Sequence, residues 1–173
     1  MHALTFWKLI TMDQADFLER LIDLLDDNHI EYCVIGGQAV NAYADPLVSL
    51  DLDLAVVTEH VDKVEQLMAD RFQVKRFPHS LNVYLPGSEL HVRIQTDLRY
   101  ADFPERAVHR SILGLDLPVA ALDDVLQGKL WAVQDSNRRP SKRQKDLADI
   151  ARLLENYPEL EQHVPEAILA RLF

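Results

Sequence analysis

Two adjacent glycines that follow a short apolar run place the strongest constraint on how this chain can fold. The run covers Tyr32–Ile35 and has the length and composition of a buried β-strand. At Gly36 and Gly37 the backbone can turn tightly and approach a bound group, because no Cβ stands in the way. Residues 38–44 are compatible with a helix. We therefore expect the glycines between a strand and a helix N-terminus, where backbone N–H groups attract phosphate.

A second apolar stretch carries two acidic residues, Asp51 and Asp53, at alternate positions. In a strand these side chains point to one face, whereas Leu50, Leu52 and Leu54 point to the other. Two neighbouring carboxylates repel each other unless a cation lies between them, and a hard divalent ion, Mg²⁺ (or Mn²⁺), satisfies both. Asp51 and Asp53 are therefore predicted to bind a metal. The alternative is a solvated strand face without a role, although Asp is disfavoured in strands.

The spacing of these motifs resembles that of the polymerase-β-like nucleotidyltransferases, in which a Gly-Gly or Gly-Ser pair precedes an Asp-x-Asp or Asp-x-Glu pair. Here thirteen residues separate Gly37 from Asp51. The resemblance implies an α/β (α+β) fold, with a mixed β-sheet flanked by helices and with C-terminal helices. It implies that Gly36, Gly37 and Gln38 hold nucleotide phosphates, that the two acids hold Mg²⁺, and that Ser49, a position where many members carry Ser or Thr, contacts substrate. A third carboxylate on a neighbouring strand then activates the acceptor hydroxyl.

Residues 89–95 are expected to form that neighbouring strand, and they depart from the family pattern. The inner positions of its polar face hold His91 and Arg93 instead of an acid. Arg93 would either neutralise the two aspartates by a bidentate ion pair, without metal, or bind a triphosphate. In the second case Glu89 or Asp97, at the strand ends, supplies the catalytic acid, unless Asp97 only starts a turn. His91 is either a substrate-binding base, since its unperturbed pKa lies near neutrality, or a plain polar-face residue.

Basic residues stand out near the end of the chain at Lys129, at 138–143 and at Lys145. One interpretation pairs Lys145 with Asp149 on a solvated helix. Another makes the basic residues a local electropositive wall for a triphosphate or an RNA acceptor. The Lys-Asp-x-x-Asp motif at 145–149, with Lys129 before it, resembles the C-terminal helices of small nucleotidyltransferase-like proteins, including those of abortive-infection and toxin–antitoxin systems. In those proteins such a lysine faces the nucleotide, so the resemblance makes Lys129 and Lys145 candidate substrate ligands.

The rest of the chain predicts one structural unit in two parts. We expect an α/β core at 1–120 and a C-terminal helical extension at 121–173 that packs on it. Helices are predicted over residues 101–110, 121–135 and 141–156 and from 158 to the end, with a short hairpin over 111–119 at the sheet edge.

Composition excludes several classes of protein. The 173 residues carry a net charge of −10, so the surface as a whole does not favour nucleic acid. The single cysteine, Cys33, excludes an internal disulfide and is expected to be an inert core residue. No apolar run approaches the roughly 20 residues that span a bilayer. We therefore expect a cytoplasmic protein without membrane contact, and the sequence leaves its oligomeric state open.

Two functions remain after these exclusions. The first is a Mg²⁺-dependent nucleotidyltransferase, which moves a nucleoside monophosphate from an NTP to a hydroxyl of an unknown acceptor (a small molecule, a protein or an RNA). The alternative is a catalytically degenerate protein of the same fold that binds a nucleotide or a partner, as a toxin–antitoxin component would. The missing strand acid is the feature that motivates the alternative.

Overall fold

The sheet is the centre of the molecule. The computed structural model describes residues 2–12 and 16–172, and within them one mixed seven-stranded sheet has the order β3-β4-β5-β2-β1-β7-β6. The strands are β1 (Tyr32–Ile35), β2 (Asp51–Val56), β3 (Gln73–Phe77), β4 (Ser80–Tyr84), β5 (His91–Gln95), β6 (Val108–Ile112) and β7 (Leu115–Val119). Strand β2 pairs antiparallel with β1 and parallel with β5, so it lies in the middle of the sheet.

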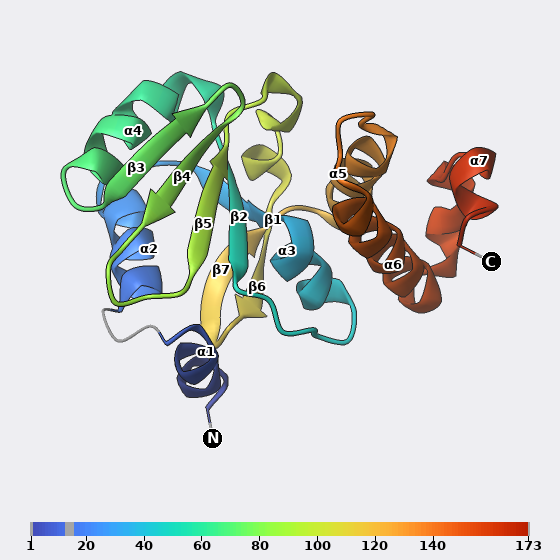
Figure 1. The fold of residues 1–173 in the computed structure, drawn as a ribbon, viewed down its shortest axis with the longest axis horizontal. Coiled ribbons are helices and arrows are strands. Elements are labelled where there is room, and N and C mark those ends of the chain that lie inside the picture. The colour runs from blue at the N-terminus through green and yellow to red at the C-terminus, as the bar shows by residue number, and fades with distance from the viewer. Residues whose placement is uncertain (1, 13–15, 173) are drawn as a thin grey trace.

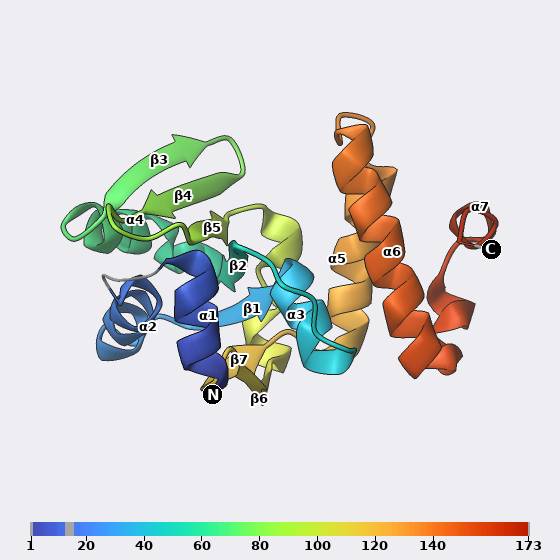
Figure 2. The same cartoon turned by 60° about the horizontal axis from the view of Figure 1, so that its bottom comes forward.

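Helices flank this sheet (Figure 1). They are α1 (Ala3–Thr11), α2 (Phe17–Asp27), α3 (Gly36–Tyr43), α4 (Val61–Ala69), α5 (Leu122–Gln134), α6 (Pro140–Asn156) and α7 (Glu166–Leu169). Short 3-10 turns cover Thr58–His60, Leu98–Tyr100, Pro104–Arg106 and Pro158–His163. Helices α2 and α4 contact each other beside β3, whereas α5 and α6 pack together against α3 (Figures 1 and 2). This mixed sheet with flanking and C-terminal helices confirms the predicted α/β (α+β) fold class.

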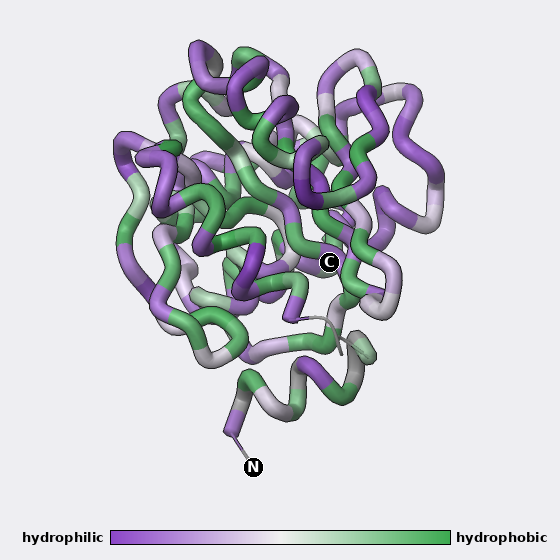
Figure 3. The backbone as a smooth tube through the Cα atoms, turned by 90° about the vertical axis from the view of Figure 1, so that its left-hand side faces the viewer, coloured by the Kyte–Doolittle hydropathy of each residue, from purple (hydrophilic) through white to green (hydrophobic). Residues whose placement is uncertain are grey.

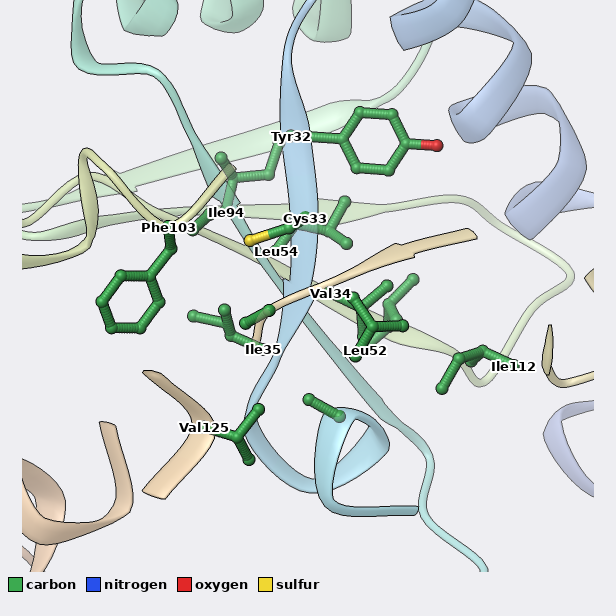
Figure 4. Close-up of a cluster of buried hydrophobic side chains, with 14 of the residues drawn as sticks. Tyr32, Cys33, Val34, Ile35, Leu52, Leu54, Ile94, Phe103, Ile112 and Val125 are labelled. Carbon is green, nitrogen blue, oxygen red and sulfur yellow. The ribbon is translucent and has the colours of Figure 1, made fainter. Parts of the chain in front are cut away.

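The core forms where the central strands meet the helices. All four residues of β1 are buried, and Leu52 and Leu54 of β2 have no exposed surface. Figure 4 shows the β1 side chains with these two leucines and with Val125 of α5, and in Figure 3 hydrophobic and hydrophilic stretches alternate along the tube. Each such side chain contributes about 1.5–3 kcal/mol when it leaves water. Burial of this kind fixes the register of β2, because a slip by one residue would bury its acids.

The predicted helix over residues 101–110 is wrong. Only Pro104–Arg106 forms a helical turn, and the chain enters β6 at Val108. The reason is tertiary pairing, since β6 runs antiparallel to β7 from Val108, opposite Val119, to Ile112. The hairpin predicted over 111–119 is confirmed, and its turn falls where Leu113 and Gly114 have φ of 57° and 86°.

Two further details of the expected elements change. The helix expected from residue 158 to the end is divided into the 3-10 turn Pro158–His163 and α7 (Glu166–Leu169), because the backbone is extended at Val164 and Pro165. Strand β5 begins at His91, so Glu89 lies exposed before the strand and outside the ladder with β2. In the described part of the chain, no helix is both long enough and apolar enough to cross a bilayer.

Candidate nucleotide and metal site

The two aspartates lie side by side on one face of β2, as the alternation predicts. The side chains of Asp51 and Asp53 are 40% and 26% exposed, while Leu52 between them is fully buried on the other face. None of the hydrogen bonds found among the described residues reaches the carboxylate of Asp53. Burial raises the pKa of this carboxyl, and the charges of Arg93 and Lys129 oppose that shift. The oxygens of Asp53 are therefore available to a cation that enters the site.

Gly36 brings the first turn of α3 against Asp53. Its φ is +67°, in the region that favours glycine, and it follows directly on β1, where Ile35 pairs with Asp53. A Cβ at Gly36 would lie 2.5 Å from Oδ2 of Asp53. The glycine is thus needed both for the turn and for the close approach, and the start of α3 faces the carboxylate. At Gly37, by contrast, a Cβ would meet no atom within 4 Å.

Strand β5 places two nitrogen side chains beside the acids. Its register puts His91 opposite Asp51 and Arg93 opposite Asp53, which confirms that the two strands present these residues to one another. The contacts are loose: His91 Nδ1 lies 3.5 Å from Asp51 Oδ1, and Arg93 Nη1 lies 3.9 Å from Asp53 Oδ1. The bidentate Arg93 ion pair is therefore wrong for this structure, and the guanidinium remains half exposed at the cleft. Lys142 approaches Asp51 from α6, with Nζ 3.6 Å from Oδ2.

The opposite wall comes from α5 and α6, and its centre is a buried lysine. Lys129 Nζ lies 3.1 Å from Asp146 Oδ1 and 2.6 Å from Asp149 Oδ2, and all three side chains are at most 9% exposed. Asp146 also accepts two hydrogen bonds from Arg138, at 2.8 Å and 3.2 Å. Charges buried in this way persist because each has an opposite partner.

The contacts in this wall show that the interpretation in which Lys145 pairs with Asp149 on a solvated helix is wrong. Asp149 pairs with Lys129 and Arg152 rather than with Lys145, which is exposed. Asp146 and Asp149 are site residues that were not predicted from the sequence. Their signal was nevertheless present, because both lie at helical spacing on the buried stripe that continues through Ile150 and Leu153.

Two cavities that share several lining residues occupy the space between β2, β5 and the C-terminal helices. The larger of the two has a volume of about 270 Å³ and a largely polar lining. The smaller one, of about 100 Å³, is also lined by Tyr100 and Phe103. The residues common to both are Asp53, Arg93, Lys129, Arg138 and Asp146.

Most of the residues predicted from sequence meet at these cavities. Those that line one or both are Gly36, Gly37, Ser49, Asp51, Asp53, Arg93, Lys129 and Lys145. Gln38 is buried instead, and its amide Nε2 donates to the carbonyl of Ser49 at 3.3 Å. The Ser49 hydroxyl accepts from the backbone N–H of Asp51 at 3.3 Å. Gln38 and Ser49 therefore shape the segment that leads into β2.

Asp97 lies outside the lining of both cavities. Its carboxylate accepts hydrogen bonds from the side chain and the backbone N–H of Arg99, and this pairing lowers the pKa of Asp97. The residue begins the turn Leu98–Tyr100, which agrees with the alternative weighed for it.

The donor set at the site suits a hard cation that also contacts a ligand. Among residues 2–12 and 16–172, no cluster of three or more His, Cys, Asp or Glu side chains is arranged to hold a metal. Two carboxylates on one strand face are nevertheless the protein share of many Mg²⁺ sites, in which waters and substrate phosphates complete the octahedron. Asp51 and Asp53 fit such a role, because both line the cleft and the nitrogen atoms of His91, Lys142 and Arg93 lie no closer than 3.5 Å to their oxygens.

Solved structures with the same fold are nucleotidyltransferases. The crystal structure of ANT(2'')-Ia in complex with adenylyl-2''-tobramycin matches with a TM-score of 0.66 and 13% identity, over 92% of this chain and 99% of that one. Lincomycin-bound LnuA, a lincosamide antibiotic adenylyltransferase, matches with a TM-score of 0.51 and 15% identity, over 79% of this chain and 95% of that one. At such identities the likeness shows the fold alone.

Comparison of the sequence with known families identifies the chain more specifically than the likeness of fold does. A search of curated proteins finds no match. Residues 38–173, however, match the family described as nucleotidyl transferase AbiEii toxin, Type IV toxin–antitoxin system. The match covers most of the chain, including Asp51, Asp53 and the whole Lys129 wall. The chain therefore belongs to the AbiEii nucleotidyltransferase family, within the polymerase-β-like nucleotidyltransferase superfamily.

Proposed function

We propose that this protein transfers a nucleoside monophosphate from an NTP to a hydroxyl group, with Mg²⁺ (or Mn²⁺) held by Asp51 and Asp53. The observation that carries the proposal is the juxtaposition of these two carboxylates with the start of α3, where Gly36 allows the backbone to approach the Asp53 carboxylate closely. A bound divalent ion would neutralise the phosphate oxygens and align them for displacement. Family membership supports this type of reaction.

The protein groups would act by position and charge. Backbone N–H groups at the start of α3, from Gly36 and Gly37, would hold phosphate oxygens. Arg93 and Lys142, which flank the two acids, would bind the outer phosphates once the metal has taken the carboxylates. The acceptor hydroxyl attacks the α-phosphorus and gives its proton to a carboxylate, the bond from the α-phosphorus to the bridging oxygen breaks, and pyrophosphate leaves.

A third carboxylate at the cavities comes from the C-terminal helices. Asp146 lines both cavities with Asp53 and pairs there with Lys129 and Arg138, whereas Asp97 pairs with Arg99 outside them. We assign to Asp146, in place of Asp97, the role of the third carboxylate, which activates the acceptor hydroxyl. Comparison of Asp146→Asn with Asp97→Asn decides between the two, since a catalytic acid is expected to contribute about 10²-fold or more to turnover.

The proposal also covers the biological role. The family description supports a toxin of a toxin–antitoxin pair, and the neighbours whose printed names include antibiotics support a small-molecule acceptor. The acceptor could equally be a protein or an RNA, so an experiment that searches for the acceptor has to include both beside small molecules. The alternative, a binding module without catalysis, is supported by His91 and Arg93 at the positions beside the acids.

Calorimetric titration of each NTP, with and without Mg²⁺, tests the proposal. We expect Mg²⁺-dependent binding to the wild type and its loss in Asp51→Asn/Asp53→Asn, because the variant retains shape but lacks the charge that binds the ion. Asp116→Asn is the matched control, since Asp116 is an exposed acid of β7 that pairs with His109. Equal binding by wild type and double variant would overturn the proposal.

A further inference from the structure

The segment that joins α3 to β2 is held by side chains rather than by secondary structure. Residues 44–50 form this segment, which leads directly into Asp51. Asn41 of α3 makes two hydrogen bonds to the backbone of this segment. Its Nδ2 donates to the Leu47 carbonyl at 2.7 Å, and its Oδ1 accepts from the Leu47 N–H at 3.0 Å. The position of Asp51 therefore depends on how Asn41 is itself held.

Arg152 of α6 reaches across to the same place. Its Nη2 donates to Asn41 Oδ1 at 2.9 Å and also to the backbone carbonyl of Asp45. Its Nη1 donates to Asp149 Oδ1 at 2.9 Å. One guanidinium thus joins a helix, a loop and a buried carboxylate, although residues 41 and 152 lie 111 positions apart in sequence.

Asp149 extends the connection to the other wall of the cleft. Its second oxygen, Oδ2, lies 2.6 Å from Lys129 Nζ, and its side chain is 3% exposed. A continuous series of charged and polar contacts therefore runs from Lys129 through Asp149 and Arg152 to Asn41 and the segment before Asp51. The contacts of Lys129 and Arg152 in this series are charge-assisted, which is the stronger class of hydrogen bond, and the Lys129–Asp149 pair is buried.

We propose that Arg152 is a positioning residue, which sets the distance between the Asp51 side of the cleft and the Lys129 side. The inference rests on the proposed function, because that reaction needs the groups on the two walls at a fixed distance from each other. A guanidinium suits the task, since its planar fork offers several donors in fixed directions, whereas a lysine offers one point charge. Removal of Arg152 takes away the bonds that tie Asn41 and Asp45 to α6, which loosens the segment 44–50, and it leaves Asp149 with Lys129 as its remaining cation.

Hydrogen exchange tests the mechanical part of the inference without any substrate. In Arg152→Met, we expect faster exchange in peptides that cover residues 44–51, including the N–H of Leu47, and unchanged exchange in β3 and β4. Asn41→Ala, which keeps the Arg152–Asp149 pair, should loosen the same peptides. Arg76→Met is the control, since this arginine lies exposed on β3 and pairs with Glu65. Unchanged exchange over 44–51 in folded Arg152→Met would overturn the inference.

Kinetics and metal titration test its functional part. For folded Arg152→Met we expect a loss of kcat of about 10²-fold, as for a displacement of about 1 Å, with weaker Mg²⁺ binding and a small change in the KM for NTP. Arg152→Lys should recover little of this loss. Normal kcat per folded molecule would show a structural role alone and refute the positioning role. Absence of Mg²⁺-dependent NTP binding in the wild type would refute the proposed function instead, while the exchange result would still decide the link between Arg152 and the segment.

Discussion

Replacement of Gly36 by alanine should damage both the stability of the protein and the carboxylate of Asp53. The backbone strain follows from a φ of +67°, which costs about 1–3 kcal/mol for a residue with a Cβ. For a domain of this size, a change of 1 kcal/mol shifts Tm by about 2–4 °C. We therefore expect Gly36→Ala to lower Tm by about 2–12 °C.

The same substitution acts on the site through a collision. The new Cβ would lie 2.5 Å from Asp53 Oδ2 and 3.2 Å from Asp53 Cγ, whereas ordinary contact begins near 3.4 Å. The carboxylate would have to move by about 1 Å, and a displacement of that size near the chemistry can reduce turnover by about 10²-fold. Mg²⁺-dependent NTP binding should weaken in the same variant.

Gly37→Ala is the matched control, and its Tm is not expected to fall. Its Cβ would meet no atom within 4 Å, and alanine in a helix is more favourable than glycine by about 1 kcal/mol. Differential scanning calorimetry should therefore give Gly37→Ala a Tm equal to or above that of the wild type. If Gly36→Ala instead kept the wild-type Tm and Mg²⁺-dependent binding, the close approach to Asp53 would have no functional meaning.

Three further predictions concern buried or paired charges. Burial raises the pKa of the Cys33 thiol to about 12, so iodoacetamide at pH 8 should leave the native protein unmodified and label it in guanidinium; rapid native labelling would contradict this. Lys129→Met should lower the free energy of unfolding in urea by about 3–5 kcal/mol, because two buried carboxylates lose their shared cation, and a loss below about 1 kcal/mol would refute the buried network. Arg99 lowers the pKa of Asp97, so that pair stabilises the fold above pH ~4 and the contribution disappears as pH falls through the folded pKa. In Asp97→Asn the free energy of unfolding should therefore fall less steeply as the pH is lowered, and an unchanged slope would contradict the stabilising role of the pair.

Local sequence patterns were enough to predict the first wall of the site. The glycine turn and the acids on β2 depend on neighbours within one strand–helix–strand unit, where period-2 alternation fixes the face of each side chain. The parallel register with β5 then confirmed that Arg93 lies opposite Asp53. The separation of 3.9 Å between their closest charged atoms, however, is a property of packing that no pattern contains.

The second wall depends on contacts between distant elements. Lys145 and Asp149 have the spacing of a surface helix pair, but α5 buries Asp149 against Lys129 and leaves Lys145 exposed. The first part of β6, at 108–110, was expected to be helical for a similar reason, because its exposed residues, with few apolar positions, gain strand structure from pairing with β7. In both cases tertiary partners override a pattern that is ambiguous by itself.

The most direct test of the account is transfer of label from NTP. Purified protein with Mg²⁺ and a cell extract is given NTP labelled at either the α- or the γ-phosphate, and the products are separated into small molecules, proteins and RNA. The account predicts stable incorporation of α-label into one of these fractions, release of γ-label as pyrophosphate, and loss of both in Asp51→Asn, with Asp116→Asn active. Incorporation of γ-label, or α-transfer that survives in Asp51→Asn, would contradict nucleotidyl transfer at this site.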